Sequence, residues 1–240
     1  METAIIGKKL GMTQIFDEAG KVIPVTVIQA GPCTVVQKKT EEKDGYVAVQ
    51  LGFEEVPERK LTKPELGHSK KVGKALRVLK EFKLDNAADL NVGDEINATV
   101  FAAGDRVDIT GISKGHGYQG PVKRHGGHIQ KMTHGGGPVH RHAGSMGSTT
   151  DPSRIFKGHN GAGQMGNEQV TVMNLDVVKV DEELGVIAVR GAVPGPKGGV
   201  VALRTSVKKV KIAQVTEAGR VNPQKASARV NPQKASARNK

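Results

Sequence analysis

Residues 111–166 constrain the fold most, because this stretch does not have the composition of a packed core. It contains 15 of the 31 glycines, seven of the eight histidines, seven Lys/Arg residues and one acidic residue, Asp151. Large aliphatic side chains are scarce in it. Ordering a backbone costs about 1–2 kcal/mol per residue, and a segment with so few apolar groups cannot offset that cost by burial. We therefore expect contacts from outside the chain to order this segment.

The positive charge is concentrated in two parts of the chain. The formal net charge is +12, of which residues 111–166 contribute +6 and residues 205–240 contribute +8, while residues 1–110 and 167–204 sum to −2. Lys and Arg that neutralise phosphates release condensed counterions, so this distribution predicts a polyanionic ligand. A membrane surface would attract the same charge, but neither basic part has an apolar face to insert into it. RNA is the ligand that we expect.

Other features of the sequence limit the classes of protein that fit. The single cysteine, Cys33, cannot form an intramolecular disulfide and is consistent with a reducing compartment. We expect it to be a small, half-buried residue beside a strand rather than a nucleophile. The N-terminus does not have the pattern of a signal peptide, and no stretch approaches the roughly 18 consecutive apolar residues of a membrane span. We therefore expect a soluble, cytoplasmic protein without membrane contact.

Short strand patterns separated by turn residues dominate the remaining sequence. They cover residues 4–16, 22–28, 34–37, 46–53, 76–84, 96–101, 107–112, 170–180, 186–193 and 200–203. In residues 170–180 the alternation slips near Asn174 and Leu175, which predicts a bulge. A short helix is expected to begin near Pro64, since proline suits a first helical position. The pattern predicts a mainly β fold, a closed antiparallel β-barrel with a short helical insertion and a long irregular Gly/His-rich basic loop.

The same patterns predict three parts in the chain. Residues 1–110 and 167–212 form the barrel body, and residues 111–166 leave it as an extended loop and return to it. A loop of this length is either functional or disordered. Residues 213–240 form a basic tail that contains VNPQKASAR twice in tandem. Its composition predicts disorder unless RNA holds it.

The histidines of the loop first suggest a metal site. His125 and His128, or His140 and His142, could share an ion, with His134 or His116 as a third ligand. Against this, the loop has no cysteine, it lacks carboxylates to orient the imidazoles, and Lys123, Arg124 and Arg141 would repel a cation. We therefore predict neither a metal nor another cofactor. A metal-assisted hydrolase remains a competing hypothesis.

Other catalytic readings of the loop are weaker. Ser145, Ser148 and Asp151 lie near several histidines, but no strand–nucleophile–helix turn surrounds them. The glycine runs lack the Gly-Lys-Ser/Thr ending of a phosphate-binding loop. We therefore predict a protein that is not an enzyme and has no small-molecule substrate.

RNA binding accounts for the features of the loop together. Glycines let the backbone approach phosphates, and the basic residues are spaced so that an extended segment meets many phosphates in turn. Histidine can stack on bases or donate to phosphates. Tyr118 and Phe156 are the two aromatic residues of the loop, too few for a sequence-reading platform, so we expect recognition of RNA shape and backbone. The predicted RNA-binding residues are Lys8, Lys9, Lys114, His116, Tyr118, Lys123, Arg124, His125, His128, Lys131, His134, His140, Arg141, His142, Arg154, Lys157 and His159.

Four motifs in order resemble a known family. They are GKKLGMTQIF (residues 7–16), ITGISKGHGYQGPVKRH (109–125), FKGHNGAGQMGNEQVTVMNLDVV (156–178) and RGAVPGPKGG (190–199). Together they resemble bacterial large-subunit ribosomal protein L3, over residues 4–211. The tandem tail lies beyond the usual end of that family. A free basic protein that binds nucleic acid outside the ribosome is a competing hypothesis.

The resemblance implies a fold, a function and partners. It implies a barrel of the type found in translation proteins, which binds 23S rRNA early in assembly of the large subunit. Residues 111–166 would be the loop that extends toward the peptidyl transferase centre, where residues 142–150 and 160–164 would influence antibiotic action. Ribosomal proteins L14 and L19 would be neighbours. Gln164 matches the glutamine that is N5-methylated in some members, which implies a glutamine methyltransferase as a further partner.

Overall fold

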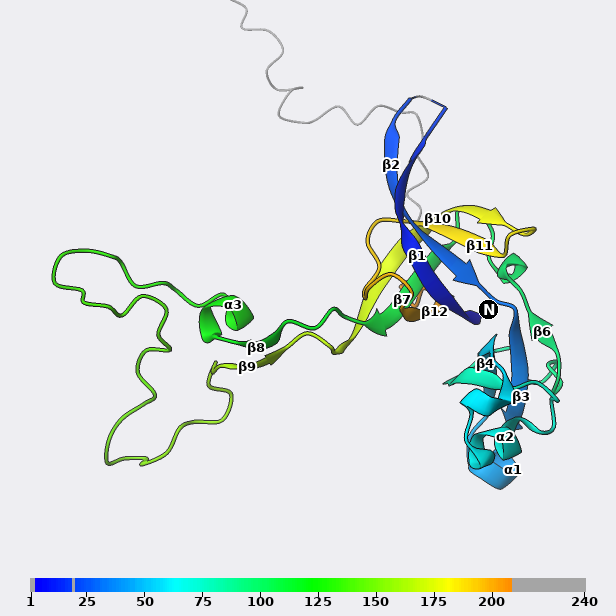
Figure 1. Ribbon diagram of the computed structural model, residues 1–240, viewed down its shortest axis with the longest axis horizontal. Coiled ribbons are helices and arrows are strands. Elements are labelled where there is room, and N and C mark those ends of the chain that lie inside the picture. Colours follow the sequence, from blue (N-terminus) through cyan, green and yellow to red (C-terminus); the bar gives the residue numbers. More distant parts are fainter. Residues whose placement is uncertain (1–2, 19, 209–240) are drawn as a thin grey trace, which may run out of the picture. The chain divides into compact units, whose positions relative to one another are not determined.

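The computed structural model describes residues 3–18 and 20–208 (Figure 1). The predicted basic tail, residues 213–240, and the last four residues of the predicted body lie outside the described residues.

Six antiparallel strands form a closed barrel in the order β1-β12-β7-β10-β11-β2. Their bounds are Ala4–Phe16 (β1), Val22–Ala30 (β2), Arg106–Ile112 (β7), Gln169–Asp181 (β10), Val186–Arg190 (β11) and Val200–Thr205 (β12). The predicted closed antiparallel barrel is confirmed. Closure pairs every one of these strands on both sides, which removes the exposed edges of an open sheet.

Alternating apolar side chains fill the core of the barrel. Val107 and Ile109 on β7, and Ile187 and Val189 on β11, are fully buried. Leu203 on β12 is paired with Ile109 and is also fully buried. Because successive side chains of a strand point to opposite faces, these apolar positions determine the register of each strand.

Four further strands form a second sheet with the order β5-β4-β3-β6. Their bounds are Cys33–Lys39 (β3), Ala48–Glu55 (β4), Leu76–Phe82 (β5) and Glu95–Ile96 (β6). The sequence predicted these segments as further strands of the barrel, and the structure corrects that detail. Periodicity identifies strands but not their partners, because both sheets bury side chains in one continuous core that includes Ile6, Ile28, Val35 and Leu51.

Cys33 is completely buried rather than half-buried, at the start of β3. Its Sγ donates to the carbonyl oxygen of Ile6 on β1 at 3.3 Å. Burial raises the pKa of the Cys33 thiol to about 11, although the hydrogen bond to Ile6 opposes that shift. Cys33 therefore joins the two sheets as a packing residue and has neither the exposure nor the pKa of a nucleophile.

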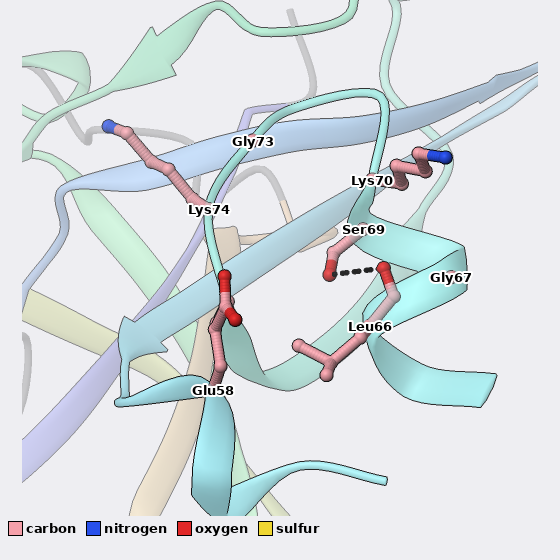
Figure 2. A pocket seen from close by; sticks show the side chains of 8 residues that line it. Glu58, Leu66, Gly67, Ser69, Lys70, Gly73 and Lys74 are labelled. Atoms are coloured by element: carbon pink, nitrogen blue, oxygen red, sulfur yellow. Dashed lines mark hydrogen bonds between the residues drawn. The ribbon is translucent and has the colours of Figure 1, made fainter. Parts of the chain in front are cut away.

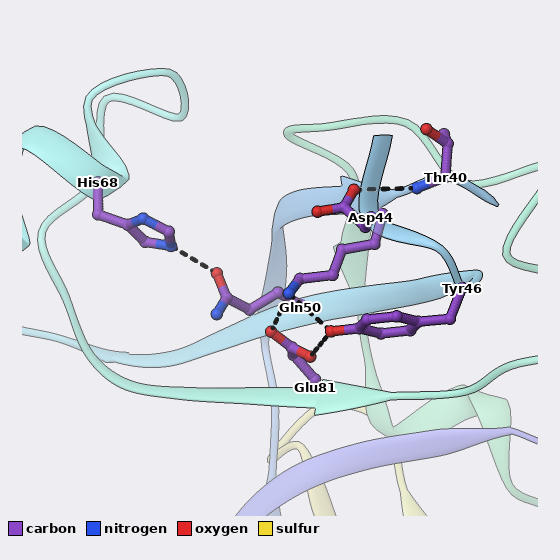
Figure 3. A network of polar contacts seen from close by, with 7 residues as sticks. Thr40, Asp44, Tyr46, Gln50, His68 and Glu81 are labelled. Atoms are coloured by element: carbon purple, nitrogen blue, oxygen red, sulfur yellow. Dashed lines mark hydrogen bonds and ion pairs between the residues drawn. The ribbon is translucent and has the colours of Figure 1, made fainter. Parts of the chain in front are cut away.

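A polar network stabilises the closed end of the β3–β4 hairpin, where the short helix α1 (Glu41–Asp44) connects the two strands (Figure 3). The Tyr46 hydroxyl accepts a hydrogen bond from Lys39 Nζ at 2.7 Å and donates to Glu81 at 3.0 Å. Lys39 also pairs with Glu81 at 3.0 Å. The hydrogen bond from Lys39 is the main cause that lowers the pKa of Glu81. The network links β3 to β5 across the sheet.

The predicted short helix near Pro64 is confirmed as α2, Lys63–Ser69. It follows the 3₁₀ turn η1 (Glu58–Lys60), and both lie between β4 and β5.

The strand predicted over residues 96–101 is wrong beyond Ile96. There the chain forms a second 3₁₀ turn, η2 (Ala98–Val100), which buries Ala98 and lets Phe101 reach the core.

The predicted bulge in β10 is confirmed, and Asp108 on β7 explains it. The register between β10 and β7 shifts between Val172 and Leu175, and Asn174 has a φ of 58°. The carboxylate of Asp108 is fully buried and accepts a hydrogen bond from the Asn174 backbone N–H at 2.9 Å. A side chain thus replaces the interstrand hydrogen bond that the bulge removes.

Candidate nucleic-acid interface

A short two-stranded stem continues from the barrel strands β7 and β10 into residues 113–168 (Figure 1). The Ser113 N–H donates to the carbonyl of Glu168 at 2.9 Å, and the His116 N–H donates to that of Met165 at 2.9 Å. Strands β8 (Gly117–Gln119) and β9 (Gly163–Met165) follow, with Tyr118 opposite Gln164. Because β7 and β10 are neighbouring strands of the barrel, the first and last residues of the loop lie next to each other.

Glycine is needed at one position of the stem, where two backbones approach closely, and a second glycine lies against a side chain. Gly166 has a φ of +71°, and a Cβ at that position would lie 2.1 Å from the Lys114 carbonyl oxygen. A Cβ at Gly163 would lie 2.8 Å from Nη1 of Arg124. The glycines of this segment therefore have a structural role in the stem in addition to the predicted role of approaching phosphates.

A third short helix, α3 (Pro121–His125), lies directly beyond β8. Proline stands in its first turn, and Gly126, with a φ of 68°, ends it in the left-handed conformation. This helix was not predicted. It places Lys123, Arg124 and His125 in its last turn, where positive charge interacts favourably with the helix dipole.

Arg124 connects the outgoing and returning parts of the loop. Its Nη1 donates to the carbonyl oxygen of Gly161 at 3.2 Å, and its guanidinium packs against Gly163. The sequence identified Arg124 only as a basic residue for RNA, because the fold of α3 that brings it to Gly161 has no local signal. Arg124 therefore helps to shape the base of the loop.

The loop has almost no interior. Of residues 111–166, only Gly111 is buried, and the others are half-exposed or exposed. The exposed fractions of Tyr118, Met132 and Phe156 are 77%, 74% and 62%. Within the part of the chain that the structure describes, no ion pair involves the seven Lys and Arg residues of this loop. Its cations and its apolar side chains are thus both available to a partner.

The structure brings four of the seven predicted loop histidines together. His125, His128, His142 and His159 line one pocket of about 430 Å³ with Asn160. His116 instead lines a neighbouring pocket of about 470 Å³, which also contains Lys114, Arg124, His125 and Gln164. These two pockets place imidazole and cationic groups from both sides of the stem next to each other.

The remaining loop residues are spread along the segment between α3 and β9. Nδ1 of His140 is buried without a hydrogen-bond partner. Over the described residues, no three His, Cys, Asp or Glu side chains are arranged to hold one metal ion. The guanidinium of Arg154 lies 5.8 Å from the centre of the Phe156 ring, so these two side chains form one exposed cation–aromatic pair. Lys131, His134, Arg141 and Lys157 are exposed.

Lys8 and Lys9 have partners inside the protein. Lys8 Nζ pairs with Glu54 at 2.9 Å. Lys9 is 8% exposed, and its Nζ donates to the carbonyl oxygens of Val193 and Gly195 at 2.6 and 2.9 Å. Burial is the main cause that lowers the pKa of Lys9, and the nearby charge of Lys114 lowers it further. Lys9 thus fixes the turn after β11 against the base of the stem, a role that only the tertiary structure reveals.

A comparison with protein families gives a match over the middle of the chain. The model of the family described as ribosomal protein L3 matches residues 78–185. Over these residues, the chain is similar to the ribosomal protein L3 family. The match spans most of β5, all of β6 and β7, the whole loop with its stem, and all of β10. The segment with the unusual composition therefore lies entirely within the match.

The match with the ribosomal protein L3 family bears on the general role of the protein. The match supports a structural protein of the large ribosomal subunit, and the family associates with the ribosome and its RNA. The family is not an enzyme family. Among the described residues, no helix is long and apolar enough to cross a membrane.

Proposed function

We propose that this protein binds 23S rRNA directly through residues 111–166, supports early assembly of the large subunit, and extends this loop toward the peptidyl transferase centre. One observation carries the proposal. The loop has a single carboxylate and seven Lys/Arg residues without ion pairs, and beyond Gly111 it buries no residue within the protein. RNA supplies both the negative charge and the contacts that this loop lacks.

The mechanism that we propose has two parts with different rigidity. The barrel and the stem are folded by their own contacts and fix where the loop begins and ends. The segment between α3 and β9 becomes ordered between RNA helices as its cations neutralise phosphates. The proposed contacts are Lys114, His116, Tyr118, Lys123, Arg124, His125, His128, Lys131, His134, His140, Arg141, His142, Arg154, Lys157 and His159.

The two N-terminal lysines enter this proposal differently. Lys8 is one-third exposed and keeps an ion pair with Glu54, so we place it at the border of the interface. Lys9 has two carbonyl partners and is almost fully buried, so we leave it out of the interface and assign it an internal role. The domain division into body, loop and basic tail remains part of the proposal.

We also propose that Gln164 is N5-methylated by a glutamine methyltransferase. Gln164 is an exposed residue of β9, and its amide makes only long hydrogen bonds, at 3.3 and 3.4 Å, to the carbonyls of Met165 and Gly166. A methyl group on this nitrogen would leave one N–H free to donate. Mass spectrometry of the peptide containing Gln164, purified from its native source, should show the mass of one added methyl group. An unmodified peptide would contradict the assignment.

Association with the ribosome is tested by sedimentation of a cell extract. We expect the protein in the 50S and 70S fractions and in the cytoplasm, together with ribosomal proteins L14 and L19 as proposed neighbours. Crosslinking within the 50S fraction would identify those neighbours. Absence from both ribosomal fractions would exclude the proposal and would favour a free nucleic-acid-binding protein.

Direct binding is tested with a variant of the loop and a matched control. Replacing Lys123, Lys131 and Arg141 by Gln removes three loop cations, and replacing Lys21, Lys43 and Lys179 by Gln removes three exposed cations elsewhere. Each phosphate contact contributes about 0.7–0.9 to the slope of log Kobs against log salt concentration. The loop variant should therefore lose about 2 to 3 units of slope on a 23S rRNA transcript, and the control should lose little. Equal slopes for the two variants would rule out the loop as the main contact.

A further inference from the structure

A second basic segment, residues 56–75, leaves a sheet and returns to it as the loop does. It connects the paired strands β4 and β5, where Glu55 lies opposite Leu76. The Val56 N–H donates to the carbonyl oxygen of Ala75 at 2.9 Å and closes its base. We call residues 56–75 the helical insertion, because they contain η1 and α2.

The charge of the helical insertion is opposite to that of the body around it. The insertion has six Lys/Arg and two acidic residues, whereas the rest of residues 1–110 and 167–204 has 14 basic and 20 acidic residues. The nearly neutral body is therefore an acidic scaffold with one basic segment. Such a local reversal of charge produces a local positive potential, which net charge alone does not reveal.

Most cations of the helical insertion are free to bind a partner. Arg59, Lys63, Lys70 and Lys71 are exposed and make no ion pair in the structure. Lys74 is different, because it pairs with Glu95 of β6. Together with Lys60, which is also exposed, five positive charges thus lie on a segment that the hydrogen bonds of α2 and the closed base hold in place.

The two acidic residues of the insertion do not neutralise these cations. Glu65 accepts hydrogen bonds from the Thr62 N–H at 2.8 Å and the Thr62 hydroxyl at 2.9 Å, and so caps α2. Glu58 lines a hollow of about 290 Å³ with Leu66, Ser69 and Lys70. Figure 2 shows the Glu58 carboxylate at this hollow, while the side chains of Lys70 and Lys74 point away from each other. A small anion in the hollow would meet that carboxylate, so the outer surface is the site that favours negative charge.

The surface of the insertion also indicates which polyanion fits. Its apolar residues, including Leu61 and Leu66, are at least half-buried, and none of its large hydrophobic side chains is exposed. Protein interfaces have an apolar core and few lysines. Contacts with a nucleic-acid backbone instead rely on Lys and Arg against phosphates. The insertion therefore has the surface expected for an RNA backbone and not for an acidic protein.

We propose that the helical insertion is a second RNA-binding surface, which contacts phosphates of the ribosomal RNA through Arg59, Lys63, Lys70 and Lys71, separately from the loop. The proposal rests on the proposed function, since it uses the same RNA. The insertion and the loop leave different sheets, so they contact different parts of the RNA. Two separated contacts would fix the orientation of the body on the RNA, which a single loop cannot do.

The test compares a variant of the insertion with a control of equal charge in the full-length protein. The insertion variant carries Lys63→Gln, Lys70→Gln and Lys71→Gln, and the control carries Lys21→Gln, Lys43→Gln and Lys179→Gln. The six lysines are exposed and have no ion pair in the structure. Thermal unfolding should show the same midpoint for both variants. Binding to a 23S rRNA transcript is then measured over a range of salt concentrations, with nucleotide footprinting of each complex.

The insertion variant should lose about 2 to 3 units of salt slope, which corresponds to three phosphate contacts, and the control should lose little. It should also lose protection of a set of nucleotides that the loop variant still protects. A slope and footprint equal to those of the control would overturn the second surface and leave the loop as the RNA contact. If the unmodified protein does not bind the transcript, the proposed function fails together with this inference.

Discussion

At the scale of single residues, two positions of this protein have structural roles that cannot be predicted from the residue type. Gly166 lies where the outgoing and returning chains nearly touch. Lys9 is a lysine that is only 8% exposed, and its Nζ donates to two backbone carbonyls. Both residues act at the base of the loop, so both determine how the loop leaves the barrel.

Replacing Gly166 by Ala should open the stem. The new Cβ would lie 2.1 Å from the Lys114 carbonyl oxygen, and the φ of +71° is unfavourable for Ala. Hydrogen exchange of the Ser113 and His116 amides should become faster, because these amides donate to the carbonyls of Glu168 and Met165 across the stem. Gly120→Ala is the matched control, since Gly120 has a φ of −71° and no atom within 4 Å of its Cβ position. Unchanged exchange in Gly166→Ala would show that the stem tolerates a side chain there.

Replacing Lys9 by Met should destabilise the barrel. The substitution keeps the length of the side chain but leaves the buried carbonyls of Val193 and Gly195 without their donor. Losing the partner of a buried polar group costs about 1–3 kcal/mol, which urea unfolding measures as a change in the free energy of unfolding. Lys21→Met, at an exposed lysine, should change that free energy by only a few tenths of a kcal/mol. Equal stability of both variants would contradict the internal role of Lys9.

At the scale of elements, the short helices depend on their caps because they are too short to be stable alone. Helix α2 begins with a reciprocal arrangement of Thr62 and Glu65. The hydrogen bond from the Thr62 N–H is the main cause that lowers the pKa of Glu65 from 4.5, with the Thr62 hydroxyl second. The cap formed by Thr62 and Glu65 therefore helps to hold α2, and with it the helical insertion, in place.

The Glu65 cap predicts a pH dependence of α2. Because the pKa of Glu65 is lower in the folded protein, its contribution to stability is present above pH 4.5 and is lost as the pH falls through the folded pKa. Amide exchange in α2, corrected for intrinsic rates, should show less protection in acid. Glu65→Gln should remove this dependence, and Glu58→Gln should keep it as the matched control. The same pH dependence in Glu65→Gln would assign it to another group.

At the scale of the whole molecule, the protein divides its tasks between a core that folds by burial and a loop that does not. The barrel and the second sheet share one apolar core. The loop contains only the stem and α3 as regular structure in the described residues. Stability and binding therefore depend on separate sets of residues, and substitutions in one set should leave the other property unchanged.

Hydrogen exchange tests this division over the whole molecule. In the free protein at low salt, amides of residues 126–160 should exchange rapidly, while Val107 and Ile109 in the barrel should be strongly protected. In the assembled large subunit, residues 126–160 should gain protection. Strong protection of these residues in the free protein would contradict ordering by RNA.

The sequence by itself determined the class of fold, the strands and the segment that carries the binding charge. Alternation of apolar residues and turn signals is local, so β7, β10 and the bulge at Asn174 could be recognised without coordinates. The tertiary structure alone decided which strands close the barrel, because pairing partners lie far apart in the sequence. It also placed Lys9 inside and Arg124 against Gly163, since burial depends on what the rest of the chain brings near. Four histidines became neighbours for the same physical reason: proximity in a loop is set by the path of the backbone, which composition does not encode.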